Sequence, residues 1–204
     1  MLRYEKDKNN QDILLDSNND QIMMEWEIPL MNAHIDELKP YGNVLEIGFG
    51  MGYSATQIQK YKPDSYTVIE CDINVIKKCR EWSKDYDNVT IIEGNWQDVL
   101  DRLGVYDSIF FDPTQTSDLS KMAYRIAHFN WHFIFIELCI KYHMKTGSRL
   151  STFLPSVIIN QYNKFIKDQN GISYYNKSIT MPISNECRYK NDSEALIIPI
   201  IISE

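Results

Sequence analysis

Short apolar runs alternate with amphipathic stretches along the chain from Asn43 onward. Seven runs have the length and composition of buried strands, near 43–48, 65–70, 89–93, 107–112, 148–154, 172–182 and 195–202. Helical patterns separate the first six of them, near 53–61, 73–84, 97–103, 118–144 and 156–169. This alternation predicts an α/β fold, with a mainly parallel sheet covered by helices on both faces.

An additional segment precedes the first of these strands. Ile22–Leu38 is predicted to be a helix, because apolar residues recur along it at helical spacing, with Pro29 either in its first turn or at a kink. We expect residues 1–40 to form an extension that lies over the ligand site as a lid, within one domain spanning 1–204. The alternative is that its apolar residues only pack on the sheet.

The run from Val44 to Gly52 (VLEIGFGMG) contains three alternating glycines directly after an apolar strand. Glycines at this place let the backbone turn sharply and approach a ligand closely before the next helix. The next strand ends in Glu70, an acceptor suited to a ribose diol. A dinucleotide site has the pattern G-x-G-x-x-G, whereas here Glu46 precedes G-x-G-x-G and favours the cationic S-adenosylmethionine. The alternative is a structural turn without a ligand.

Two further strand ends carry candidate binding groups. After the third strand, Trp96 is expected to cover the adenine ring, and Asp98 to accept from its amino group. The fourth strand delivers Asp112 at its carboxyl end. Ligands of open α/β sheets bind at that edge, so these residues are predicted to belong to the same site.

Composition and charge exclude several other functions. The 204-residue chain has a net charge of −7 and no basic patch, which argues against a nucleic-acid partner. The four cysteines are widely spread without metal-ligand spacing, so they are expected to be free thiols, and no metal is required. With no apolar run of membrane-spanning length and no signal peptide, the protein is expected to be cytoplasmic, without membrane contact, and a monomer or homodimer.

Four motifs in order resemble the guanidinoacetate N-methyltransferase family and the related yeast-type arginine methyltransferases. They are MEWEIPLM at 24–31, VLEIGFGMG at 44–52, IEC at 69–71 and GNWQDV at 94–99. The resemblance covers about Gln21 to Asp112, returns at Phe129-Asn130, and returns again in Cys187-Arg188-Tyr189 and the last apolar strand. It implies the class I methyltransferase sheet, Rossmann-like and seven-stranded, with the C-terminal strands antiparallel.

The resemblance also implies roles for particular residues. Met23 and Met31 would flank S-adenosylmethionine, and the loop from Gly48 to Gly52 would wrap its methionine part. Glu70 would take the ribose hydroxyls. The full set of expected cofactor contacts is Met23, Met31, Glu46, Gly48, Phe49, Gly50, Met51, Gly52, Glu70, Cys71, Trp96, Gln97 and Asp112.

Glu27 and Asp112 match the two carboxylates that hold the acceptor in this family. Two carboxylates can grip the planar N–H forks of a guanidinium bidentately and fix one nitrogen toward the methyl group. A protonated guanidinium is a poor nucleophile, so a base must accept a proton, and Asp112 is the candidate. The alternatives are that Glu27 is an ordinary acid of a first helical turn and that Asp112 is a turn former before Pro113.

Two segments depart from the family pattern. The family has Asp-Thr-Tyr-Pro where this chain has Asp112-Pro113-Thr114-Gln115, so the loop beside the acceptor must differ. A Thr-Ser pair that receives the carboxylate of guanidinoacetate is replaced by residues 154–157, in which Ser156 is the one hydroxyl left as a candidate acceptor contact. This argues against guanidinoacetate itself more than against guanidine methylation.

The leading interpretation is therefore an S-adenosylmethionine-dependent N-methyltransferase acting on a guanidino nitrogen of a small molecule. One alternative is methylation of an arginine, asparagine or other amino-bearing side chain in a peptide or protein. Another, from a different class, is an inactive methyltransferase fold used as a binding module.

Overall fold

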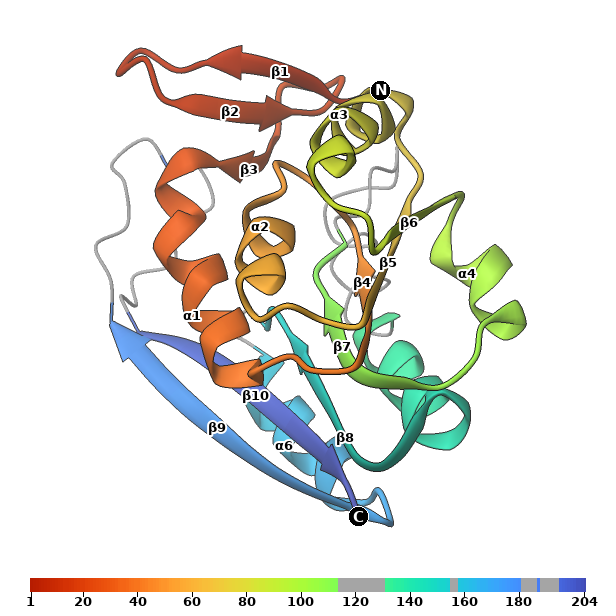
Figure 1. The fold of residues 1–204 in the computed structure, drawn as a ribbon. Helices are drawn as coiled ribbons and strands as arrows, with labels where there is room; N and C mark the ends of the chain where they lie inside the picture. Colours follow the sequence, from red (N-terminus) through yellow and green to blue (C-terminus); the bar gives the residue numbers. More distant parts are fainter. Residues whose placement is uncertain (114–130, 155–157, 181–186, 188–194) are drawn as a thin grey trace.

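The computed structural model describes residues 1–113, 131–154, 158–180, 187 and 195–204. Its main element is a seven-stranded sheet (Figure 1), in spatial order β6 (Val89–Glu93), β5 (Ser65–Glu70), β4 (Asn43–Ile47), β7 (Tyr106–Phe111), β8 (Met144–Thr152), β10 (Ala195–Ser203) and β9 (Ile172–Thr180). The first five strands pair in parallel, and β10 is antiparallel to both β8 and β9. The predicted sheet is confirmed.

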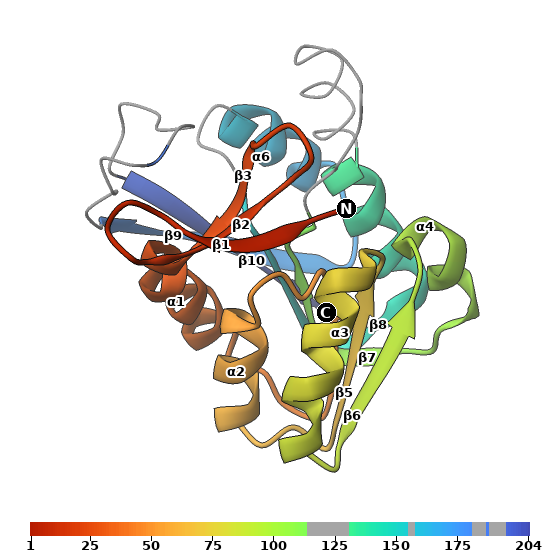
Figure 2. The ribbon, with the colours of Figure 1, turned by 90° about the horizontal axis from the view of Figure 1, so that it is seen from above.

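Helices cover both faces of this sheet (Figure 2). One face carries α1 (Ile28–Leu38), α2 (Tyr53–Lys60) and α3 (Ile73–Trp82), which ends in the 3-10 turn η2 (Ser83–Asp85). The other carries α4 (Trp96–Val99) with η3 (Leu100–Arg102), a helix over 131–138 that continues as the π-helix η4 (Cys139–His143), and α6 (Ile159–Lys167). Each helical layer encloses its own apolar core.

Alternation along the central strands divides residues between the two cores. In β7, Phe110 packs in the core of α1–α3, whereas Ile109 and Phe111 pack in the core on the opposite face. Successive side chains of a strand point to opposite faces. Asp112, two residues after Phe110, is therefore directed toward the face that α1 covers.

The first 24 residues form a second sheet that the sequence analysis did not predict. Its antiparallel strands are β1 (Arg3–Lys6), β2 (Asp12–Leu15) and β3 (Gln21–Met24). The two turns use the same chemistry: Asp7 and Asp16 each accept two backbone amides, while Asn10 and Asn19 take φ values of 61° and 63°. The Asn/Asp-rich stretch is thus a pair of hairpin turns.

The predicted helix Ile22–Leu38 is wrong in its first six residues. Residues up to Met24 belong to β3, and Glu25–Glu27 form the 3-10 turn η1. The α-helix begins only at Ile28, with Pro29 in its first turn, where a missing N–H costs nothing. The pairing of β3 with β2 outweighs the helical spacing of the apolar residues in this segment.

Other boundaries differ less. Strand β8 begins at Met144, four residues before the predicted strand, and η4 ends directly before it. Cys71, Cys79 and Cys139 are free thiols, as predicted. Within the described ranges, every helix is too short or too polar to cross a membrane.

His34 of α1 is a polar side chain buried in the core between α1–α3 and the sheet, called the α1 core below. It is fully buried, between the rings of Phe110 and Phe153, with centroid separations of 5.7 and 6.2 Å. Its Nδ1 lies 3.4 Å from Ser151 Oγ, and its Nε2 has no hydrogen-bond partner among the described residues. Burial lowers the pKa of His34 to about 3, so the imidazole is neutral at physiological pH.

We expect His34→Leu to stabilise the fold, and more so at lower pH. The unfolded chain binds a proton on His34 near pH 6.5, whereas the folded chain does so only near the lowered pKa of about 3. The folded state thus loses stability as pH falls through this window, by about 2 kcal/mol at pH 5. Urea unfolding at pH 7 and pH 5 measures the difference between variant and parent. A difference that does not grow at pH 5 would contradict this account.

Candidate active site

The loop that follows β4 turns on three glycines with positive φ. Gly48, Gly50 and Gly52 have φ values of 86°, 54° and 77°. A Cβ on Gly52 would lie 2.6 Å from the Phe49 ring, and one on Gly50 would lie 2.9 Å from Met23 Sδ. Side chains are therefore excluded at both positions by conformation and by space. The backbone of this loop is the surface that a ligand would meet.

Glu70 lies at the end of β5 and joins the glycine loop to the neighbouring turn. Its Oε2 accepts the amide of Phe49 at 2.9 Å. Its Oε1 accepts the amides of Cys71 and Asp72 at 2.8 and 2.9 Å. A carboxylate offers about four lone-pair sites, so the carboxylate keeps one free acceptor position. That position is what a ribose hydroxyl would use.

Glu46, the acid that precedes the loop, is fully buried under it. The hydroxyls of Ser54 and Tyr66 both donate to its carboxylate. Burial raises the pKa of Glu46 to about 7, although the two hydrogen bonds oppose the shift. The carboxylate thus packs α2 against the sheet, with both oxygens already bonded.

The apolar residues predicted around the cofactor occupy different depths. Met23, on β3, reaches the loop, and its Sδ accepts the amide of Met51 at 3.3 Å. Met31 and Phe49 are 2% and 1% exposed in the α1 core. Among these apolar residues, Met23 and Met51 are therefore the two that contact each other at the glycine loop.

The third predicted group lies around α4. Trp96 is 5% exposed and packs edge-on against Phe111 and Phe135, so its ring belongs largely to the core. Gln97 is exposed beside it. Cys71, which follows β5, is exposed as a residue, but partial removal of its thiol from water and the nearby acids Glu70 and Asp72 raise its pKa to about 11.

Asp112 and Glu27 converge beside the glycine loop. The Asp112 amide donates to the Ile47 carbonyl at 3.2 Å, and a Cβ on Gly48 would lie 3.1 Å from the Asp112 carbonyl oxygen. Glu27, just before α1, is 7% exposed, and its Oε2 accepts the Met24 amide at 3.0 Å. Removal from water, together with the charges of Glu27 and Glu46, raises the pKa of Asp112 well above its ordinary value. A cation bound here would offset the repulsion between these carboxylates.

The sequence analysis missed two tyrosines at this edge. Tyr4, on β1, donates its hydroxyl to the Gly50 carbonyl at 2.7 Å. Tyr53 begins α2 next to the loop, and burial followed by the charges of Glu25, Asp12 and Glu27 raises its pKa. The signal for Tyr4 was the apolar residues at alternating positions of the first strand, Leu2 and Tyr4, followed by an Asp/Asn turn.

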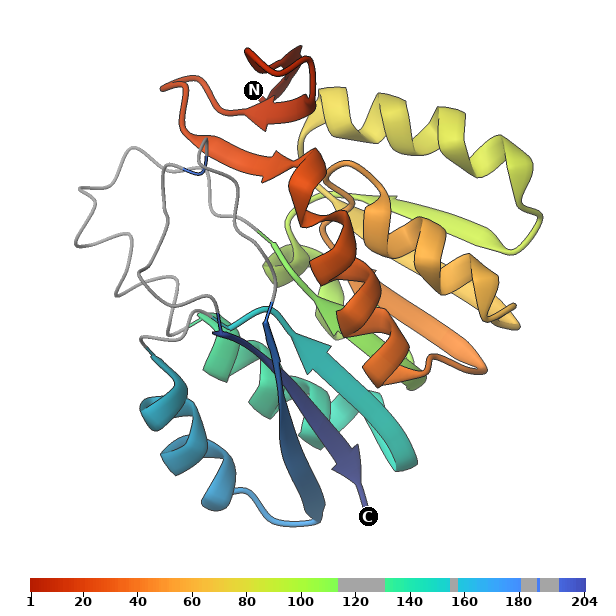
Figure 3. The same cartoon turned by 90° about the vertical axis from the view of Figure 1, so that its left-hand side faces the viewer.

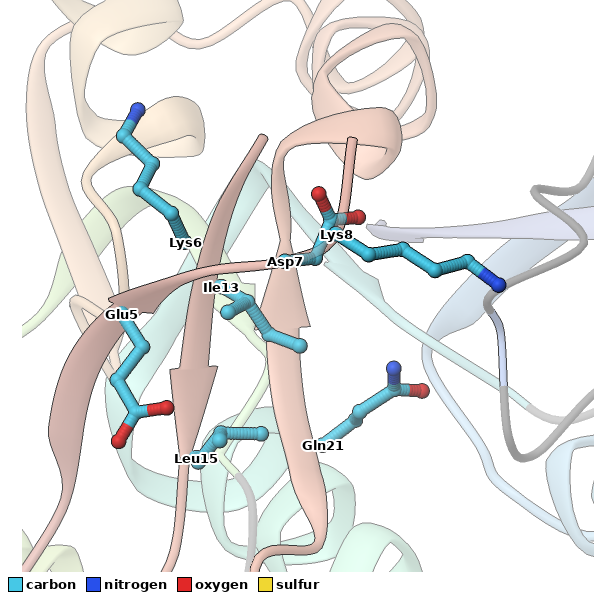
Figure 4. Close-up of a pocket in the computed structure, with 7 residues that line it drawn as sticks. All are labelled: Glu5, Lys6, Asp7, Lys8, Ile13, Leu15 and Gln21. Atoms are coloured by element: carbon cyan, nitrogen blue, oxygen red, sulfur yellow. The ribbon is translucent and has the colours of Figure 1, made fainter. Parts of the chain in front are cut away.

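A separate hollow of about 240 Å³ lies on the N-terminal sheet (Figure 4). Ile13 and Leu15 of β2 form its apolar part, and residues of both charges from 5–8 surround them together with Gln21. None of the predicted site residues lines it. No glycine lines it, so it lacks the glycine turn expected of a nucleoside site.

Some predicted site residues lie outside the described part of the chain. These are Ser156 and the resemblance positions Phe129, Asn130, Arg188 and Tyr189. Among the described residues, no three of His, Cys, Asp and Glu are grouped as a metal site.

Comparison with known proteins gives a family for this chain. The model of the family described as guanidinoacetate N-methyltransferase matches residues 3–170. Protein arginine N-methyltransferase 2 of Candida glabrata is 41% identical over 118 residues, covering 54% of this chain and 27% of that protein. The protein of the same name from Saccharomyces cerevisiae is 34% identical over 118 residues, covering 54% and 29%. The matched segment is thus under a third of these curated relatives.

Solved structures agree on the fold. Precorrin-6y C5,15-methyltransferase from Geobacter metallireducens has a TM-score of 0.63 at 12% identity, covering 98% of this chain and 94% of that one. An O-methyltransferase from Bacillus cereus in complex with SAH has a TM-score of 0.61 at 12% identity, covering 89% and 82%. The predicted class I methyltransferase fold is confirmed. Since the family match spans most of the chain and the fold agrees with it, this chain belongs to the guanidinoacetate N-methyltransferase family.

Proposed function

We propose that this chain transfers a methyl group from S-adenosylmethionine to a guanidino nitrogen of a small, guanidinoacetate-like molecule. The observation that carries the proposal is the placement of Glu27 and Asp112. The charge of Glu27 acts on the Asp112 carboxylate, and the Asp112 backbone abuts the glycine loop. The family match and the fold support the same chemistry.

The described residues fit S-adenosylmethionine. The backbone from Gly48 to Gly52 allows close approach, and Glu70 keeps one acceptor position for a ribose hydroxyl. The Met23 side chain lies against the loop and accepts the Met51 amide through its Sδ. Trp96 and Met31 are both buried, so they would support the residues that line the cofactor site rather than offer much surface to the cofactor themselves. When bound, the cofactor supplies an electrophilic methyl group on a positively charged sulfur.

The two carboxylates would divide the work on the acceptor. Glu27 holds two N–H groups of the guanidinium and keeps positive charge away from the attacking nitrogen. Asp112 holds the nitrogen that is methylated and accepts its proton as the new N–C bond forms. A raised pKa makes Asp112 a better proton acceptor than an ordinary aspartate. Alignment of the reacting atoms can supply roughly 7–11 kcal/mol of the rate gain.

A second candidate is arginine methylation in a protein or peptide. The two curated relatives carry the name protein arginine N-methyltransferase 2. A carboxylate pair that grips a guanidinium would hold an arginine side chain equally well. The first 40 residues would serve as the cover of the site in either case, because β1 and β3 both contact the glycine loop.

Mass-spectrometric detection of methyl transfer separates these candidates. Guanidinoacetate, free arginine and an arginine-containing peptide would each be incubated with the chain and S-adenosylmethionine. Transfer to guanidinoacetate supports the small-molecule function. Preference for the peptide supports the second candidate, and no transfer to any acceptor despite cofactor binding supports an inactive binding module.

We expect Asp112→Asn to abolish turnover while cofactor binding persists. The amide cannot accept the proton, and it loses one of the two negative charges that hold the acceptor. A loss of 100-fold or more in kcat is expected, as is usual for removal of a general base, with roughly 10²–10⁴ attributed to such groups. Calorimetric titration with S-adenosylhomocysteine measures binding. Asp101→Asn, in the exposed turn η3, is the matched control, and retained turnover in Asp112→Asn would remove Asp112 as the base.

We also expect the acid limb of the kcat/KM profile to lie well above pH 4, the ordinary range of aspartate. Asp112 must be ionised to act, and its pKa is raised by removal from water and by Glu27 and Glu46. Glu27→Gln removes one of these negative charges, so the limb should shift to lower pH although the maximum rate falls. Rates measured from pH 4 to 9 test this. An unmoved limb in Glu27→Gln would contradict the coupling.

A further inference from the structure

The N-terminal sheet touches the cofactor loop at two points from different strands. Tyr4 of β1 donates to the Gly50 carbonyl at 2.7 Å. Met23 of β3 accepts the Met51 amide and fills the space beside Gly50. Figures 2 and 3 show this sheet lying across the ends of α2 and α3, at the carboxyl edge of the main sheet. A donor and an acceptor from the sheet thus hold the carbonyl and the amide of a single peptide group, the one between Gly50 and Met51.

The first strand is also fastened at its beginning, where α3 starts. The Leu2 amide donates to Asp72 Oδ2 at 2.7 Å, and the Asn74 side-chain amide donates to the Leu2 carbonyl at 2.7 Å. Leu2 itself is 7% exposed and packs in the α1 core. These bonds join residues about seventy positions apart, at the turn that follows Glu70. Strand β1 therefore spans from the β5 turn to the glycine loop.

The surroundings of Tyr4 keep its hydroxyl a donor. Burial and the charges of Glu70 and Asp72 raise the pKa of Tyr4. Lys78 Nζ lies 4.1 Å from the centre of its ring, a cation–π contact that fixes the ring from the α3 side. The side chain is therefore held between α3 and the loop, with its hydroxyl directed at one carbonyl.

We propose that Tyr4 is a positioning residue for the cofactor: β1 is a strap whose docking holds the Gly50–Met51 peptide in its binding conformation and whose release precedes cofactor exchange. The inference rests on the proposed use of S-adenosylmethionine. The loop needs such support because its three glycines, which have positive φ here, can adopt many other backbone conformations when no contact restrains them. A restrained loop loses less conformational freedom on binding, which favours affinity.

The test compares cofactor binding in three full-length variants. Tyr4→Phe removes the bond to Gly50, and Asn74→Ala removes one of the two bonds that hold Leu2 at the start of β1. Tyr61→Phe is the matched control, because its hydroxyl donates to Asp36 Oδ1 at 2.8 Å at the other end of α2. Calorimetry gives the Kd of S-adenosylhomocysteine, stopped-flow fluorescence gives its dissociation rate, and thermal unfolding shows that each variant is folded.

Tyr4→Phe is expected to raise the Kd about 3–10-fold, the range of one lost hydrogen bond, mainly through faster dissociation. Asn74→Ala is expected to speed dissociation in the same direction, and Tyr61→Phe to change neither quantity. The rate of hydrogen exchange at the Met51 amide should rise in Tyr4→Phe and stay unchanged in Tyr61→Phe. In turnover, KM for S-adenosylmethionine rises while kcat stays within about twofold.

The outcomes are distinguishable. If Tyr4→Phe and Tyr61→Phe give the same Kd and dissociation rate, Tyr4 does not position the loop. If Asn74→Ala leaves dissociation unchanged, β1 is not a strap. In both cases parent-protein binding would leave the proposed cofactor intact. Failure of the parent protein to bind S-adenosylhomocysteine would overturn the cofactor assignment and this inference together.

Discussion

The hydrogen bonds of Glu70 hold the candidate site together. One carboxylate oxygen takes the amide of Phe49 in the glycine loop, and the other takes the two amides that follow β5. The turns that follow the neighbouring parallel strands β4 and β5 are thereby held at a fixed distance from each other. Everything else at this edge, from the backbone of Asp112 to the strap of β1, is placed relative to those two turns. The residue that would bind a ligand is thus also the one that shapes its site.

Sequence periodicity predicted the main sheet because its central strands are buried on both faces. Runs such as Val44–Ile47 and Tyr106–Phe111 are short and mostly apolar, and turn-forming residues follow them, which distinguishes them from helices. The N-terminal sheet was missed because each of its strands has only four residues, too few to show a clear alternation of apolar and polar positions. The Asp/Asn turns between them are the one sequence feature that marks where each strand ends. Ile22 to Met24 fits a helical spacing equally well, and only the pairing with β2 decides its structure.

The candidate site was predictable where one motif carries the whole geometry. The glycines and Glu70 follow from local sequence, since their places are set within one strand–helix–strand unit, β4–α2–β5. The environment of Glu46 was not predictable, because its bonds to Ser54 and Tyr66 depend on how α2 and β5 pack. The contact of Tyr4 with Gly50 joins positions 46 residues apart. Tertiary packing, not a motif, supplies such partners.

The position of β10 in the sheet has a consequence for how the protein is made. This strand lies between β8 and β9 but follows both in the chain. During translation β8 and β9 therefore emerge before the strand that joins them, with their backbone edges unpaired. The sheet closes only when residues 195–203 have left the ribosome. Until then β8 has one unpaired edge and β9 has two, and these are the edges at which a chaperone would have the most to protect.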